Sequence, residues 1–82
     1  MSDLVKIFFS LKSEKDMGNF LENILTPGEI EEILRRLKIM SLLQKGFTQR
    51  EVATKVGVGI ATVSRGARVL KYGKPGLNLF FK

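Results

Sequence analysis

Basic side chains recur at helical spacing toward the end of the segment Thr48–Lys71, TQREVATKVGVGIATVSRGARVLK. Arg65, Arg68 and Lys71 are three residues apart, so on a helix they follow one another turn by turn along one side. Cationic side chains in this arrangement neutralise the phosphates of a nucleic acid that lies along the helix. The segment is therefore a candidate for binding duplex DNA.

The residues that begin this helix are small or polar, as a helix needs if it is to approach base edges in the major groove. They are Ala61, Thr62 and Ser64. The two hydroxyls and the helix N-terminus are suited to donate hydrogen bonds to phosphate. Arg50, on a preceding helix, has the reach for a bidentate contact with guanine O6 and N7. The spacing thus predicts both phosphate and base contacts.

The elements that must hold these side chains are two short helices. Thr48 and Glu51 form a capping box that opens a helix ending near Val56. Gly57-Val58-Gly59 supplies the turn, where either glycine adopts a positive φ without strain. The following helix, residues 60–71, is predicted to bury Ile60, Val63, Ala67 and Leu70.

A small residue, a glycine four positions later and a branched apolar residue six beyond that are typical of a helix-turn-helix. Ala53, Gly57 and Val63 meet this pattern. Each position has a physical role: the first allows a close helix crossing, the second a sharp turn, and the third anchors the second helix. The pair of helices is therefore predicted to be a helix-turn-helix.

A longer helix is predicted before this pair. Thr26-Pro27-Gly28-Glu29 is a capping box with proline at the first helical position, and Gly46 supplies the stop after about Lys45. Its first half places Glu31 and Glu32 four residues before Arg35 and Arg36 and turns Ile30, Ile33, Leu34 and Leu37 inward. Its second half, IMSLLQ, is apolar on nearly all sides, which predicts a core shared between two subunits.

The N-terminal part reads as two apolar arms. Residues 3–12 have helical spacing with Asp3 as the expected N-cap, residues 13–19 interrupt it, and residues 20–25 form a second apolar stretch. The arms lack a basic polar face, which argues against a membrane surface as the partner. We predict one domain over 1–82: dimerisation helices 1–25, core helix 26–46, helix-turn-helix 48–71 and tail 72–82, with Leu77, Leu79, Phe80 and Phe81 packing against the body.

Composition narrows the function further. Residues 1–45 hold seven basic and seven acidic side chains, whereas residues 46–82 hold seven basic side chains and one acid, so the net charge of +6 lies in the C-terminal part. That asymmetry favours a polyanion partner. The chain contains no Cys and no His, which removes disulfides, the usual zinc ligands and histidine acid–base catalysis, so neither a metal site nor an enzyme is expected. No run approaches the ~20 apolar residues of a membrane span, and we expect a soluble cytoplasmic protein.

Three runs of this chain resemble the tryptophan repressor superfamily: LTPGE (25–29), RRLKIMSLLQKG (35–46) and TQREVATKVGVGIATVSRG, continuing to VLK (48–71). The tail VLKYGKPGLNL resembles the YerC/YecD-like branch of that superfamily. The resemblance implies an all-α, intertwined homodimer that reads a palindromic operator in double-stranded DNA. It also implies a pocket for L-tryptophan, or a similar small corepressor, between the central helix and the recognition helix.

The resemblance assigns roles residue by residue. The DNA-facing positions of the family's motif are occupied by Gln49, Arg50, Ile60, Ala61, Thr62, Ser64, Arg65 and Lys71, to which the spacing adds Arg68. The ligand positions are occupied by Asn23, Leu25, Thr26, Arg36, Arg65 and Gly66. The two arginines would sandwich an aromatic ring, one of them would also pair with the ligand carboxylate, and the glycine would leave room for the ring. Val69 stands where the repressor has a serine that helps to bind the amino group.

These observations predict a sequence-specific, DNA-binding transcriptional regulator, a repressor controlled by tryptophan or a similar ligand. Two other functions fit parts of the pattern. One is a DNA-targeting or architectural helix-turn-helix module that needs no ligand. The other is a protein–protein adaptor whose basic face meets an acidic partner.

Overall fold

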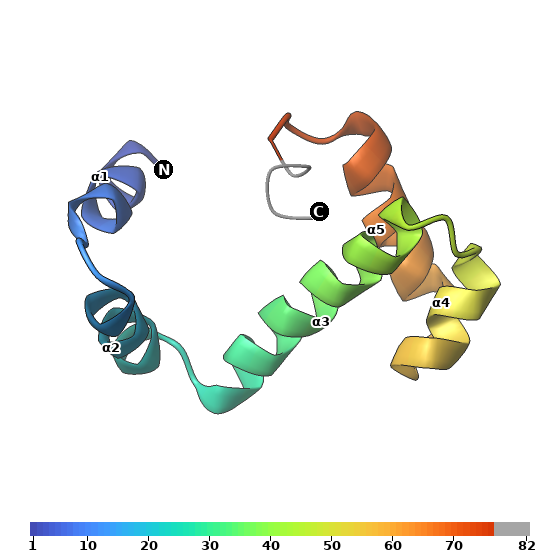
Figure 1. Ribbon diagram of the computed structural model, residues 1–82, viewed down its shortest axis with the longest axis horizontal. Helices are drawn as coiled ribbons and strands as arrows, with labels where there is room; N and C mark the ends of the chain where they lie inside the picture. The colour runs from blue at the N-terminus through green and yellow to red at the C-terminus, as the bar shows by residue number, and fades with distance from the viewer. Residues whose placement is uncertain (77–82) are drawn as a thin grey trace. The chain divides into compact units, whose positions relative to one another are not determined.

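Five α-helices make up the part of the chain that the computed structural model describes, residues 1–76 (Figure 1). They are α1 (Ser2–Ser10), α2 (Glu14–Ile24), α3 (Pro27–Gln44), α4 (Gln49–Val56) and α5 (Ile60–Tyr72). Residues 1–76 contain no β-strand, so the predicted all-α class is confirmed. The predicted packing of Leu77, Leu79, Phe80 and Phe81 lies outside the described residues.

The chain divides into two compact units, one formed by Met1–Glu31 and the other beginning at Glu32. In the first unit, α1 and α2 meet through an edge-to-face contact between Phe8 and Phe20, with ring centroids 5.4 Å apart. Several large apolar side chains of this unit are exposed in the single chain: Leu4, Val5, Ile7, Phe9 and Ile24.

Two predictions about the first unit are wrong. Helix α1 takes Met1 as its N-cap rather than Asp3, because the helix already begins at Ser2. Residues 14–19, which were expected to interrupt the helical spacing, form the beginning of α2, and the break between the two helices lies at residues 11–13. The backbone N–H of Asp16 donates to Ser13 Oγ (3.1 Å), and this local cap stabilises a helix start that hydrophobic periodicity does not register.

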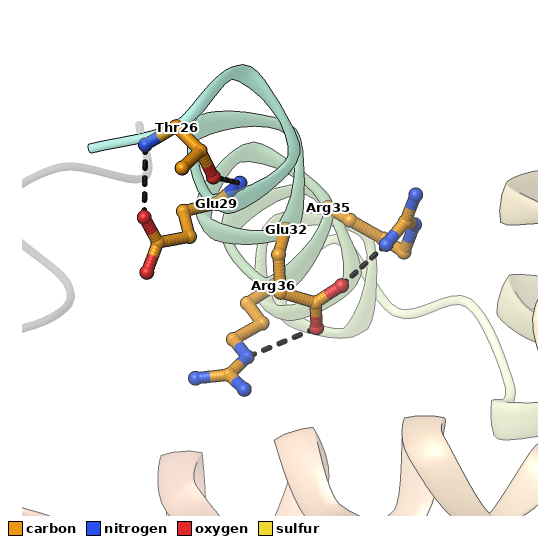
Figure 2. Close-up of polar contacts among 5 residues, drawn as sticks. All are labelled: Thr26, Glu29, Glu32, Arg35 and Arg36. Carbon is orange, nitrogen blue, oxygen red and sulfur yellow. Dashed lines mark hydrogen bonds and ion pairs between the residues drawn. The ribbon is translucent and has the colours of Figure 1, made fainter. Parts of the chain in front are cut away.

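Helix α3 begins with the predicted capping box (Figure 2). The Thr26 N–H donates to Glu29 Oε1 (2.8 Å), and the Glu29 N–H donates to Thr26 Oγ1 (3.2 Å). Further along the helix, Glu32 accepts hydrogen bonds from both Arg35 and Arg36 Nε, the latter at 3.2 Å. The helix ends at Gln44, and Gly46 has the positive φ (99°) expected of its stop signal.

The core of the second unit joins α3, α4 and α5. Ile39, Val52 and Val63 are no more than 1% exposed, and a ring of partly buried apolar residues packs against them: Leu42, Leu43, Phe47, Ala53, Val56 and Val58. These contacts fix the two helices of the predicted helix-turn-helix on the second half of α3. Ile60, which was predicted to be buried, is 51% exposed, because it is the first residue of α5 and lies a turn before the core contact at Val63.

The first half of α3 presents apolar side chains that are exposed among the described residues of the second unit. Ile33, Leu34 and Leu37 were predicted to face inward but are 43%, 61% and 37% exposed. Within the described part of the second unit, the buried cluster draws on α3 only from Ile39 onward, so these three side chains precede it. Their spacing marks an apolar face, but the described residues of the second unit do not bury it.

Candidate nucleic-acid interface

The helix-turn-helix begins at a capping box on α4. The Thr48 N–H donates to Glu51 Oε1 (2.9 Å), and the Glu51 N–H donates to Thr48 Oγ1 (3.1 Å). The hydrogen bond from the Thr48 backbone lowers the pKa of the Glu51 carboxyl, and the Thr48 side chain and the positive charge of Lys55 lower this pKa further. The predicted boundaries of α4 are confirmed at both ends.

The turn between the helices depends on one of its two glycines. Gly57 is left-handed (φ 79°), and the N–H groups of Gly57 and Val58 both donate to the Ala53 carbonyl, at 2.9 and 3.1 Å. Gly59 is extended (φ −71°) and serves as the N-cap of α5. Val58 packs on the core and Val63 is fully buried, so the Ala53, Gly57 and Val63 pattern has the structure that was predicted for it.

Eight of the nine residues predicted to face DNA are exposed, and Ser64 is half-buried. Arg65, Arg68 and Lys71 lie on successive turns of α5, as their spacing predicted. Gly59 has no side chain to accept from the first N–H groups of α5, in contrast to Thr48 at the start of α4. The surface therefore combines small and polar residues at a helix N-terminus with cations further along. The exposed residues are Gln49, Arg50, Ile60, Ala61, Thr62, Arg65, Arg68 and Lys71.

A hydrogen bond connects the two helices on this surface. The Ser64 hydroxyl of α5 donates to Gln49 Oε1 of α4, at 2.7 Å. Among residues 1–76, it is the one side-chain hydrogen bond that links two different helices. The sequence reasoning placed both residues on the DNA-facing side but did not pair them, because they are fifteen positions apart.

A pocket of about 250 Å³ lies beside this surface, between α3 and α5. It brings together Arg36, Arg65 and Gly66, three of the predicted ligand residues. Its other lining residues are Glu32, Ile39, Met40, Thr62 and Val69. Thr62 and Arg65 thus belong both to the exposed part of α5 and to the pocket.

Gly66 allows α5 to approach α3 closely. A Cβ placed on Gly66 would lie 3.0 Å from Ile39 Cγ2 and 3.8 Å from Met40 Cγ. The glycine was expected to leave room for a ligand ring, and it does line the pocket, but its hydrogen also faces the buried Ile39 side chain. Packing between the helices therefore also favours a glycine here, because a Cβ would crowd Ile39.

The remaining predicted ligand residues belong to the first unit. Asn23, Leu25 and Thr26 precede Glu32, where the second unit begins, and their part in a ligand site stays a prediction. Thr26 Oγ1 already accepts the Glu29 N–H in the capping box.

Glu32 is the charged pocket residue that was not among the predicted ligand residues. The sequence pattern related it to Arg36 by spacing alone, yet it also lines the pocket, and its carboxylate accepts from Arg36 (Figure 2). The signal was available in the i, i+4 spacing, because a residue four positions before Arg36 lies on the same side of the helix. The pocket therefore contains a carboxylate as well as two guanidinium groups.

None of the helices in residues 1–76 combines the length and the hydrophobicity that a membrane span requires. These residues also hold no cluster of three or more Asp and Glu side chains placed to bind a metal ion.

Comparison with known proteins places these features in a family. The model of the Trp repressor protein family matches residues 1–82. A Trp operon repressor homolog of Xylella fastidiosa is 44% identical over 69 residues, covering 83% of this chain and 75% of that protein. A Trp operon repressor homolog of Chlamydia caviae is 36% identical over 81 residues, covering 98% of this chain and 80% of that protein.

Two other proteins are also similar to this chain. The uncharacterized protein YerC of Bacillus subtilis is 32% identical over 73 residues, covering 89% of this chain and 70% of that protein. The crystal structure of a TrpR-like protein from Eubacterium eligens has a similar fold, with a TM-score of 0.84 and 31% sequence identity. The match covers 98% of this chain and 82% of that chain. The resemblance read from the three sequence runs is confirmed: this chain belongs to the Trp repressor family, whose members are DNA-binding transcription regulators and not enzymes.

Proposed function

We propose that this protein is a cytoplasmic, sequence-specific transcriptional repressor that binds a palindromic operator in double-stranded DNA as a homodimer. One observation carries the proposal. The exposed side of α5 begins with small and polar residues and continues with cations, and α5 is fixed to α4 by the core at Val52 and Val63. A helix of this kind enters the major groove with its N-terminal end toward the bases.

The positive charge of this surface also supports binding to DNA. Arg50, Arg65, Arg68 and Lys71 are all exposed, so their charges are available to phosphate. The first N–H groups of α5, which Gly59 leaves uncapped by a side chain, also attract an anion because they carry the positive end of the helix dipole.

The salt dependence of binding tests this electrostatic contribution. If Arg65, Arg68 and Lys71 each neutralise one phosphate in both subunits, while Arg50 contacts a base, log K should fall with log salt at a slope of about −5. Arg68→Ala should reduce the slope by about 2, because one contact is lost from each subunit. Lys15→Ala, which removes a charge from the first unit, is the matched control and should leave the slope unchanged. A flat salt response of the native protein would contradict binding through this surface.

Base recognition is tested by variants at two exposed positions. Arg50→Ala and Thr62→Ala should each weaken binding to a selected operator, while the oligomeric state stays the same. A lost bidentate arginine contact costs about 1–3 kcal/mol of discrimination between bases. Unchanged operator affinity in both variants would favour the adaptor function instead.

The homodimer is supported by the uncovered apolar face of α3. Ile33, Leu34 and Leu37 lie within two turns of one helix, and a chain of 82 residues buries little core alone. A second copy of the chain would cover this face. Leu34→Glu should shift the protein toward monomer in sedimentation equilibrium, whereas Lys45→Glu, just after α3, should remain dimeric. A native protein that sediments as a monomer at all concentrations would refute the homodimer.

The pocket supports control by a small ligand with an aromatic ring and a carboxylate, such as L-tryptophan. Arg36 and Arg65 supply two guanidinium planes, and Ile39, Met40 and Val69 supply apolar contacts. Its volume of about 250 Å³ is near the lower limit of ~300 Å³ for ligand pockets, which suits a single amino acid. Calorimetric titration with L-tryptophan should give heat that Arg36→Ala abolishes.

A second function, DNA binding without a ligand, is favoured by one observation in the same pocket. Glu32 already pairs with Arg36, so a guanidinium group that a ligand carboxylate would use has a partner within the chain. The same titration separates the two functions. Absence of heat with the native protein, together with operator binding that L-tryptophan does not alter, would leave the ligand-independent module.

A further inference from the structure

The hydrogen bond between Ser64 and Gln49 restricts what both residues can do on DNA. A serine hydroxyl has one hydrogen to donate, and Ser64 gives it to Gln49 Oε1 at 2.7 Å. Ser64 is therefore not free to donate to a phosphate while this bond exists. Ser64 is half-buried and Gln49 is exposed, which agrees with Ser64 supporting Gln49 rather than contacting DNA itself.

Gln49 retains its amide NH₂ group as a donor. An unrestrained glutamine pairs with adenine by accepting from N6 and donating to N7, which requires both ends of the amide to face the base. Here the Ser64 hydroxyl holds the oxygen end of the amide toward α5. The oxygen keeps a second lone pair, but turning it toward a base would break the bond to Ser64.

We propose that Ser64 is a positioning residue that sets the base preference of Gln49. Held by Ser64, the Gln49 amide donates to a base that presents only acceptors at its major-groove edge, guanine through N7 and O6 or thymine through O4, and disfavours adenine. The inference rests on the proposed function, since it requires that α4 and α5 meet the major groove.

Selection from a library of randomised duplex DNA tests this inference without knowledge of the operator. Native protein should enrich guanine or thymine at the base position that depends on Gln49, and Gln49→Met, which keeps the length but removes the amide, identifies that position by losing the preference. Ser64→Ala should shift the preference there toward adenine, with a change in relative enrichment of roughly tenfold. Ser64→Thr retains the hydroxyl and should keep the native preference.

The outcomes separate this inference from the proposed function. If native protein enriches no sequence, the proposed function fails and the inference falls with it. If native protein enriches a site but prefers adenine at the Gln49 position, or if Ser64→Ala lowers affinity for all sequences equally, DNA binding stands and the inference is overturned. Gln49→Met is a second, independent check that does not alter Ser64: an unchanged base profile in this variant also overturns the inference.

Discussion

Replacing Gly66 with alanine should destabilise the protein even though it improves helix propensity. Alanine is favoured over glycine in a helix interior by about 1 kcal/mol. The added Cβ, however, would lie 3.0 Å from Ile39 Cγ2, and Ile39 is 1% exposed and cannot move into solvent. Overpacking a buried contact costs ~1–3 kcal/mol, so we expect a net loss of up to about 2 kcal/mol.

Gly18→Ala provides the matched control for Gly66→Ala. Gly18 lies inside α2, is exposed, and a Cβ there would meet no described atom within 4 Å beyond its own helix backbone and chain neighbours. In this variant the higher helix propensity of alanine acts alone, so the free energy of unfolding should rise by up to about 1 kcal/mol. The difference between the two variants measures the cost of crowding Ile39.

Urea denaturation followed by circular dichroism, at one fixed protein concentration, gives both free energies of unfolding. The concentration must match because association would contribute to the measured stability. In a separate thermal unfolding experiment, the midpoint temperature should change by about 4–8 °C for each kcal/mol in a domain of this size. If Gly66→Ala stabilises the protein as much as Gly18→Ala does, the close approach of α5 to Ile39 is wrong.

Three further predictions concern capping, pH and the pocket. Thr48→Ala removes the side-chain cap of α4 and should lower the free energy of unfolding by about 1 kcal/mol in the same denaturation assay. Folding lowers the pKa of Glu51, so its stabilising contribution is complete above the usual carboxyl pKa of 4.5 and is lost as the pH falls through the lower folded value. The stability gap between native protein and Glu51→Gln should therefore close in strong acid, and an equal gap at pH 3 and pH 7 would contradict this. Glu32→Gln removes the carboxylate that accepts from Arg36, so L-tryptophan affinity measured by calorimetry should rise; a fall would show that Glu32 assists the ligand instead.

Capping residues and turn glycines in the sequence correctly predicted where α3 begins and where α4 begins and ends. The boxes at Thr26 and Thr48 and the glycine after Val56 involve residues within four positions of one another, so their chemistry can be read from the chain itself. The start of α2 depends on an equally local cap at Ser13, but its first turn is largely charged, so the spacing of apolar residues alone places the start too late.

Features that depend on contacts between helices could not be predicted from these local signals. Periodicity placed Ile60 on the apolar side of α5, but only the crossing point at Val63 shows that Ile60 lies outside the core. The partnership of Gln49 with Ser64 requires the crossing geometry of two helices. The spacing of Ile33, Leu34 and Leu37 predicted an apolar face on the first half of α3. The spacing did not specify whether this chain or another would cover that face.

The contacts that join α4 to α5 also determine when the recognition surface becomes ordered. Val52 and Val63 are fully buried, Val58 packs on the same core, and the Gly57 turn is closed by two hydrogen bonds to Ala53. The backbone entropy of arranging the exposed side of α5 is therefore lost when the chain folds, and only the exposed side chains remain to be ordered when a partner binds. Consequently, a cavity at Val63 would weaken binding by loosening this preorganised surface, although Val63 touches no partner.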